Sequence, residues 1–181
     1  MQSTWSPERL NFAVIRIPDA INASHCAHLL AEAKAHPKWF SLGHYDSTLT
    51  NTVTSASQRE VQVSAGFQGS WEPSPLLPRL AHIVKSSWGI SLEKFSGYGV
   101  SRYDTESKLP LHQDTRHDDG RLITFVLYLS VAKAGGDIQF PTIDLSVASR
   151  PGDILLFPSN LPHMVSPISD GDRWVIVWFG K

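Results

Sequence analysis

The sequence has little of what marks several large classes of protein. It contains one cysteine, Cys26, so it cannot form an internal disulfide, which fits a reducing compartment. Its formal net charge is −1, without the basic excess that binds nucleic acid or acidic membranes. No apolar run approaches the roughly 18 residues of a membrane span, and the N-terminus lacks a signal-peptide pattern. These absences predict a soluble, cytoplasmic protein with no nucleic-acid or membrane partner.

The first half of the chain predicts helices and a few short strands. Residues 12–18 are rich in branched apolar residues and predict a short strand. Apolar residues at helical spacing predict one helix over 19–36 and a second over 75–87, which ends near Gly89. Residues 41–70 are polar and weakly patterned. We expect this segment to form edge strands with long connections, or a lid.

From residue 93 onward, short apolar runs alternate with turn residues. This pattern predicts a sandwich or jelly roll, in which two sheets enclose a cavity. The expected fold is mainly β with N-terminal helices, and its core is a double-stranded β-helix (jelly-roll, cupin-like). We expect a single domain over 1–181, with supporting elements in 1–92 and the core in 93–181. Eight strands are expected, over residues 100–103, 109–112, 122–129, 137–140, 145–148, 154–157, 163–167 and 174–179.

His112-Gln113-Asp114 is a candidate metal-binding motif. Residues i and i+2 of a strand share one face, so the imidazole of His112 and the carboxylate of Asp114 can reach one ion. His163 follows a predicted strand and a turn, and it is the candidate third ligand. Two histidines and one carboxylate on one face of an octahedral ion are typical of non-haem Fe(II) oxygenases.

The His-x-Asp pattern by itself is weak evidence, because the chain contains it three times. The other two copies are His44-Tyr45-Asp46, in the weakly patterned segment, and His117-Asp118-Asp119, in what reads as a solvated turn. Only the middle copy directly follows a strand-like run, Leu109-Pro110-Leu111. Its context therefore selects His112 and Asp114.

Arg173 and Tyr128 are candidates for binding an anion. Arg173 opens the apolar run 174–179, and a buried guanidinium needs an anionic partner. That partner is either a structural carboxylate, Asp153 or Asp172, or the carboxylate of a ligand. Tyr128 lies in the middle of another apolar strand, where its hydroxyl also needs a partner.

Taken in chain order, the C-terminal motifs resemble those of one enzyme family. The motifs are Tyr103, His112-Gln113-Asp114, Asp119-Gly120-Arg121, Tyr128-Leu129, Gly135-Gly136-Asp137-Ile138-Gln139-Phe140-Pro141, Pro151-Gly152-Asp153, His163 and Arg173. Their order resembles the prolyl 4-hydroxylase-like branch of the Fe(II)/2-oxoglutarate-dependent dioxygenases. The resemblance covers roughly residues 93–180, nearly half of the chain, and each motif is modest by itself while the ordered set is specific.

The resemblance implies roles for six residues. The implied iron ligands, which form the catalytic centre, are His112, Asp114 and His163. Arg173 would pair with the distal carboxylate of 2-oxoglutarate, Tyr128 would donate a hydrogen bond to it, and Tyr103 would line the same pocket. Asp114 stands where halogenases of this class leave a small residue, so hydroxylation is the expected reaction.

The implied activity is hydroxylation of an unactivated C–H bond with release of succinate and CO₂. It would use Fe(II), 2-oxoglutarate and O₂, with ascorbate as a candidate reductant. The substrate, a peptidyl residue, a free amino acid or a small metabolite, stays open, as does the oligomeric state. Two other hypotheses are a cupin-like metal-binding module without 2-oxoglutarate chemistry and a degenerate, non-catalytic binding protein. Arg173 and Tyr128 argue against the first, and the intact triad argues against the second.

Overall fold

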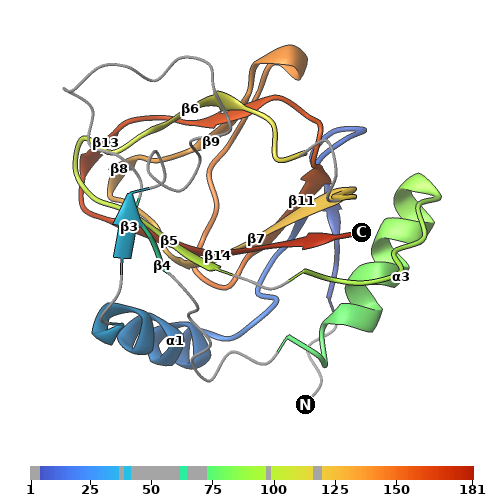
Figure 1. Cartoon of the computed structure of the whole chain (residues 1–181), viewed down its shortest axis with the longest axis horizontal. Helices are drawn as coiled ribbons and strands as arrows, with labels where there is room; N and C mark the ends of the chain where they lie inside the picture. The colour runs from blue at the N-terminus through green and yellow to red at the C-terminus, as the bar shows by residue number, and fades with distance from the viewer. Residues whose placement is uncertain (1–4, 37–38, 42–61, 65–72, 97–98, 116–119) are drawn as a thin grey trace.

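The computed structural model describes residues 5–36, 39–41, 62–64, 73–96, 99–115 and 120–181. The largest element of the fold is one eight-stranded sheet (Figure 1). Its eight strands follow the spatial order β1 (Glu8–Arg9), β2 (Ile15–Ile17), β11 (Ile154–Pro158), β7 (Ile123–Ser130), β14 (Arg173–Gly180), β5 (Gly99–Tyr103), β4 (Gln62–Ser64) and β3 (Trp39–Ser41).

A smaller sheet lies against the large one and closes the sandwich. Its four strands follow the order β10 (Leu145–Val147), β9 (Ile138–Phe140), β12 (His163–Val165) and β6 (Leu109–His112). A short pair joins β13 (Ile168–Asp170) to β8 (Ala134–Gly135), and a 3₁₀ turn, η1 (Pro141–Ile143), links β9 to β10. The mainly β, jelly-roll prediction is confirmed, and all eight predicted strands are present to within a residue or two.

Two helices, α1 (Ala23–Ala35) and α3 (Leu77–Trp88), lie in the N-terminal half of the described chain. The predicted start of α1 at residue 19 is wrong, because the backbone of Asp19 turns with a φ of 48° and the side chain of Asn22 caps the helix. Helix α3 ends where predicted, at Gly89, whose φ is 73°. Among the described residues, no helix has the length and apolar character needed to cross a membrane.

The prediction for residues 41–70 is tested only at its edges. Ser41 ends β3, and Gln62–Ser64 form β4, so two short strands extend the large sheet beyond β5. This agrees with the expected edge strands. Residues 42–61 and 65–72, where a lid was the alternative, lie outside the described residues.

Alternation along β7 divides the protein between two cores. Phe125 and Leu127 face the helices and join the core that contains Leu29 of α1. Val126 and Tyr128 face the other way, into the space between the two sheets. Because successive side chains of a strand point to opposite faces, this one strand both anchors the helices and lines the sandwich interior.

Strand β14 follows the same rule, which brings Arg173 into the interior. Trp174 and Trp178 pack on the helix side, and the ring of Trp178 stacks on Phe125 with centroids 5.3 Å apart. Val175 lies in the interior core. Arg173 has the same parity as Val175, and only 2% of its surface is exposed.

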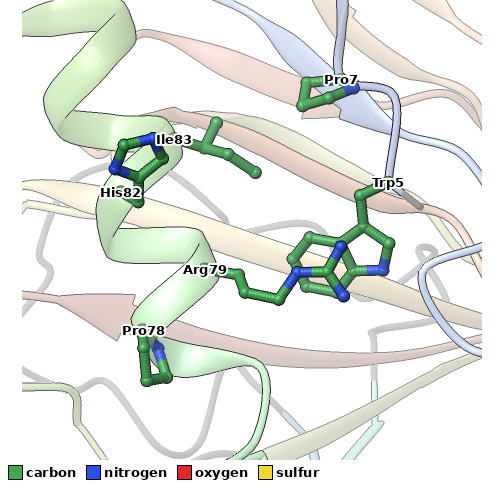
Figure 2. Close-up of a pocket in the computed structure, with 6 residues that line it drawn as sticks. All are labelled: Trp5, Pro7, Pro78, Arg79, His82 and Ile83. Carbon is green, nitrogen blue, oxygen red and sulfur yellow. The ribbon is translucent and has the colours of Figure 1, made fainter. Parts of the chain in front are cut away.

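The N-terminal segment packs along α3. The guanidinium of Arg79 lies 4.1 Å from the ring centroid of Trp5, and the indole of Trp88 donates a hydrogen bond to the carbonyl of Phe12 at 2.9 Å. An open hollow of about 420 Å³ lies at this contact, and none of the candidate site residues lines it. Figure 2 shows its lining side chains. Its lining residues are Trp5, Pro7, Pro78, Arg79, His82 and Ile83.

Gly135 is a position where we expect a methyl group to be poorly tolerated. Its φ is 78°, and a Cβ there would lie 2.0 Å from the carbonyl oxygen of Pro167. We expect Gly135→Ala to lower the free energy of unfolding by about 3 kcal/mol or more. Gly120→Ala is the matched control, since Gly120 has a φ of 67° but no atom of the described residues within 4 Å of a Cβ placed there. It should cost only about 1 kcal/mol. Chemical denaturation of both variants measures the difference, and equal losses would contradict the clash.

Cys26 should be unreactive in the folded protein. It lies on the buried face of α1, and burial, followed by the charge of Asp153, raises its pKa to about 11. Only about one thiol in a thousand is then ionised at pH 8, and the thiolate is the reactive form. We expect an aromatic disulfide reagent to label the folded protein at least ~100-fold more slowly than the protein in guanidinium chloride. Fast labelling of the folded protein would contradict this, and Cys26→Ala gives the blank.

The same raised pKa has a consequence for alkaline stability. A thiol held neutral in the fold contributes stability below its ordinary pKa of 9.0, and that contribution is lost as the pH rises from 9 towards 11. The wild-type protein should therefore lose more stability over this range than Cys26→Ala.

Candidate metal centre and anion pocket

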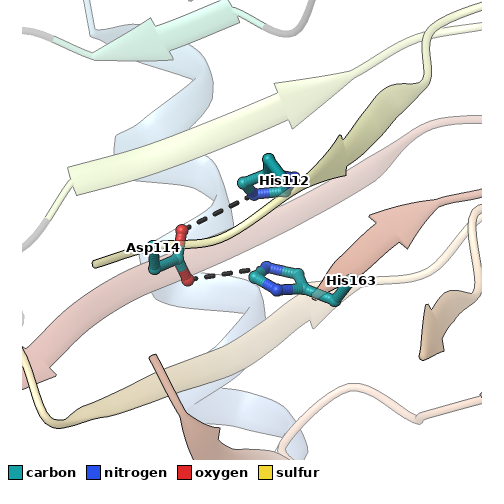
Figure 3. Close-up of side chains that lie close together, drawn as sticks. All are labelled: His112, Asp114 and His163. Atoms are coloured by element: carbon teal, nitrogen blue, oxygen red, sulfur yellow. Dashed lines mark ion pairs between the residues drawn. The ribbon is translucent and has the colours of Figure 1, made fainter. Parts of the chain in front are cut away.

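The two candidate histidines meet across neighbouring strands. His112 ends β6 and His163 begins β12, and the two residues are direct partners in the antiparallel register. Asp114 follows two residues after His112, and its Oδ1 and Oδ2 lie 3.5 Å from Nε2 of His112 and Nε2 of His163 respectively (Figure 3). The three ligand atoms lie within 4.8 Å of one another. The structure therefore gathers the triad that the sequence predicted.

Backbone carbonyls fix the orientation of both rings. The Nδ1 atom of His112 donates to the carbonyl of Pro110 at 2.8 Å, and Nδ1 of His163 donates to the carbonyl of Leu161 at 2.9 Å. A carbonyl oxygen can only accept, so each Nδ1 carries the proton. In a neutral ring this leaves the lone pair on Nε2, the atom that faces Asp114. Second partners of this kind hold metal-binding histidines in the ligating tautomer.

The protonation states also suit a metal ion. Burial lowers the pKa of His163 to about 4, although Asp114 acts in the opposite direction. Burial by itself would raise the pKa of Asp114. The hydrogen bond and charge interactions with His112 and His163 have the larger combined effect and hold that pKa below its ordinary value. Burial would lower the pKa of His112, but the hydrogen bond and charge interaction with Asp114 raise it above the ordinary value. At neutral pH the cluster thus offers an ionised carboxylate and a neutral His163, as metal ligands require.

Two hydroxyl groups around Asp114 were not predicted from the sequence. Thr124 of β7 donates to Asp114 Oδ2 at 2.8 Å, and its hydroxyl lies 3.0 Å from that of Ser159. Both residues are buried, with 1% or less of their surface exposed. The signal in the sequence was faint: a single hydroxyl residue at the start of the apolar run of β7, on the same face as Tyr128.

Arg173, Tyr103 and Tyr128 form a second cluster in the sandwich interior. Arg173 pairs in register with Tyr103, and its guanidinium carbon lies 4.6 Å from the ring centroid of Tyr103 and 5.1 Å from that of Tyr128. All three residues are buried. Burial raises the pKa of Tyr103, although Arg173 acts against this, so the phenol keeps its proton and can donate it in a hydrogen bond.

The guanidinium of Arg173 lacks the structural carboxylate that the sequence left open. The carboxylate of Asp153 accepts hydrogen bonds from the backbone N–H groups of Asp19 and Arg150. The carboxylate of Asp172 accepts a hydrogen bond from the indole N–H of Trp174. Neither carboxylate forms an ion pair with Arg173. Among the described residues, Nε and Nη1 of Arg173 and the hydroxyl of Tyr128 have no hydrogen-bond partner. A buried charge without a counter-ion is costly, so these donors fit the carboxylate of a ligand.

The second cluster, of Arg173, Tyr103 and Tyr128, lies beside the triad. Arg173 helps to lower the pKa of His163, and Asp114 acts on the pKa of Tyr103, so the charges of each cluster reach the other. Gly136 lies close to this region, since a Cβ added there would lie 3.3 Å from Cδ of Arg173. The other His-x-Asp copies, at residues 44–46 and 117–119, lie outside the described residues.

A jelly roll that holds a two-histidine, one-carboxylate cluster beside a buried arginine defines a class of protein: metal-dependent barrels that take an anionic ligand. The family comparison agrees with this class. Residues 98–180 match the model of the 2OG-Fe(II) oxygenase superfamily. This match falls on the part of the chain that carries the predicted motifs, and it agrees with the family that they resemble.

Four of the five curated relatives are named as prolyl 4-hydroxylases or a subunit of one, and the fifth as a PKHD-type hydroxylase. The chain is 24% identical over 205 residues to the protein named probable prolyl 4-hydroxylase 9 of Arabidopsis thaliana, an alignment that covers 95% of this chain and 68% of the relative. Across the curated relatives that it matches, the chain spans between 28% and 68% of their length.

Solved structures support the fold. A prolyl-4-hydroxylase of Pseudomonas putida superposes with a TM-score of 0.73 at 20% identity, over 93% of this chain and 92% of that one. A prolyl hydroxylase from Trichoplax adhaerens, solved with a peptide fragment of hypoxia inducible factor, gives a TM-score of 0.61 at 18% identity, over 94% and 84% of the two chains.

Proposed function

We propose that the chain is an Fe(II)- and 2-oxoglutarate-dependent dioxygenase that hydroxylates an unactivated C–H bond. His112, Asp114 and His163 hold Fe(II). Arg173 pairs with the distal carboxylate of 2-oxoglutarate, Tyr128 donates a hydrogen bond to it, and Tyr103 lines the pocket. When bound, the iron and the co-substrate supply O₂ activation, with release of succinate and CO₂.

One observation carries this proposal: buried donors of Arg173 and Tyr128, without a partner in the described part of the chain, lie beside a cluster with the ligand set of an iron site. The residues fit both groups. The two imidazoles and the carboxylate suit Fe(II) and leave coordination positions open, and a guanidinium suits a carboxylate in a two-point contact. The alternative, a cupin-like metal-binding module without 2-oxoglutarate chemistry, gives the buried charge of Arg173 no role.

Each residue has a separate task in this proposal. Nδ1 of each histidine keeps its proton on a backbone carbonyl, so that Nε2 stays directed at the iron. Arg173 sets the position of the co-substrate by charge and geometry. The apolar side chains of the interior core, among them Val126 and Phe157, exclude water from the reaction.

For the substrate, we propose a peptidyl residue, with a free amino acid or small metabolite as the second candidate. Support for a peptide comes from relatives that are prolyl hydroxylases, one of them solved with a peptide. We further propose ascorbate as the reductant that keeps the iron ferrous, and a cytoplasmic location, which the single cysteine favours. Residues 1–181 would act as one catalytic domain.

The test is anaerobic addition of Fe(II) and then 2-oxoglutarate to the purified protein. The expected result is a weak visible charge-transfer band that appears only when both are present. Folded protein that binds iron but gives no band would overturn the co-substrate assignment. A screen of peptides and metabolites for stimulated succinate formation then identifies the substrate, and stimulation by no peptide would favour the second candidate.

A further inference from the structure

The carboxylate of Asp114 is held asymmetrically. Each of its oxygens lies 3.5 Å from one histidine Nε2, so these contacts alone do not distinguish them. Only Oδ2 accepts a hydrogen bond from Thr124, at 2.8 Å. The two oxygens therefore differ, because one lone pair of Oδ2 is already in use.

The direction of the hydrogen bonds follows from the number of protons. An ionised carboxylate only accepts, so the single hydroxyl proton of Thr124 points at Asp114. The 3.0 Å contact between Thr124 and Ser159 must then be donated by Ser159. The result is a directed chain from Ser159 through Thr124 to Asp114, in which each hydrogen bond polarises the next.

Ser159 also holds the backbone of the same loop. Its carbonyl accepts from the backbone N–H of Asp114 at 2.8 Å and of Thr115 at 3.2 Å. Its own N–H donates to the carbonyl of Leu122, at 2.9 Å, just before β7 begins. Asp114 lies beyond the end of β6, outside the strand ladder, so these contacts replace the ladder in fixing its position.

We propose that Thr124, oriented by Ser159, is a positioning residue that makes Asp114 bind iron through Oδ1 alone. This rests on the proposed function. A carboxylate that binds through one oxygen leaves three of six octahedral positions open, whereas one that binds through both leaves two. The proposed reaction needs three, two for the 2-oxo acid and one for O₂. Thr124 thus preserves the position for O₂ without touching it.

The experiment compares wild type with Thr124→Val and Thr124→Ser, using Fe(II) alone under anaerobic conditions. Valine keeps the shape of threonine but cannot donate, and we expect it to weaken Fe(II) binding about 10- to 100-fold, the usual effect of removing an outer partner. Serine restores the donor and should bind within about 3-fold of wild type. Thermal unfolding of each metal-free variant reports whether the fold is kept.

An infrared difference spectrum, iron-bound minus iron-free, gives a readout that a purely structural role would not move. The splitting of the carboxylate stretches should be wide, as for one-oxygen binding, in wild type and Thr124→Ser, and narrower in Thr124→Val. Unchanged affinity and unchanged splitting in Thr124→Val would overturn the proposal. If Thr124→Val does not fold, Ser159→Ala replaces it, with an expected loss of about 3- to 10-fold. Absence of Fe(II) binding in wild type would instead overturn the proposed function.

Discussion

Replacing His163 with alanine is expected to remove Fe(II) binding almost completely. His163 is buried, supplies one of three ligand atoms and sits in register with His112, so no other described side chain can take its place. Loss of an outer partner costs about 10- to 100-fold in metal affinity, and loss of a ligand should exceed this. Anaerobic Fe(II) titration of the purified variant measures the change.

The matched control is His82→Ala, since His82 is an exposed histidine on α3 that takes no part in the cluster. It should bind Fe(II) as wild type does. Because His163 packs edge-on against Phe157, with centroids 4.7 Å apart, alanine leaves a cavity. His163→Gln fills more of that space and separates lost ligation from lost stability. Strong Fe(II) binding by both His163 variants would contradict the site.

Replacing Arg173 with alanine is expected to weaken 2-oxoglutarate binding about 100- to 1000-fold, with Fe(II) affinity changed little. The reason is that a buried, two-point pair between a guanidinium and a carboxylate loses about 3–4 kcal/mol when one partner is removed. The concentration of 2-oxoglutarate that half-saturates the anaerobic visible band gives the affinity. Arg173→Lys keeps the charge without the planar fork and should fall between wild type and alanine.

Arg102→Ala is the control for Arg173. Arg102 lies in β5, next to Tyr103, and pairs in register with Trp174 of β14. Its guanidinium lies over the ring of Trp174, on the helix side of the sheet and away from the interior. Its loss should leave 2-oxoglutarate affinity unchanged. An equal fall in iron and 2-oxoglutarate affinity for Arg173→Ala would show that Arg173 supports the fold and not the anion.

The triad could be predicted because local geometry determines most of it. The i, i+2 spacing of His112 and Asp114 predicted that they lie together, although Asp114 follows the end of β6 and is held by the carbonyl of Ser159. The strand before His163 was visible as an apolar run. Arg173 and Tyr128 could be predicted because a guanidinium and a phenol hydroxyl within apolar strands need partners for their charge and hydrogen bonds. Their proximity to each other was implied only by the family resemblance, since it depends on the register of β14 with β5 and β7, which no local pattern shows.

The parts that could not be predicted depend on contacts far apart in the chain. Thr124 contacts Asp114 across ten positions and Ser159 across 35, and no local pattern marks either contact. The short strands β8 and β13 pair for only a few residues, at Gly135 and Ile168. Strands this short carry too little periodicity to be read from sequence. The start of α1 was missed because a cap at Asn22 prevailed over apolar spacing.

Thr124 and Tyr128 lie on the same face of one central strand, four residues apart. That strand rises about 3.3 Å per residue, so the two side chains are separated by roughly 13 Å. Strands β11 and β14 flank it and prevent it from sliding. The distance between Thr124, which contacts the proposed metal ligand Asp114, and Tyr128, the proposed partner of the distal carboxylate, is thereby constant. We therefore expect the protein to select dicarboxylates by chain length, and to reject a 2-oxo acid one methylene longer even though its two ends are chemically identical.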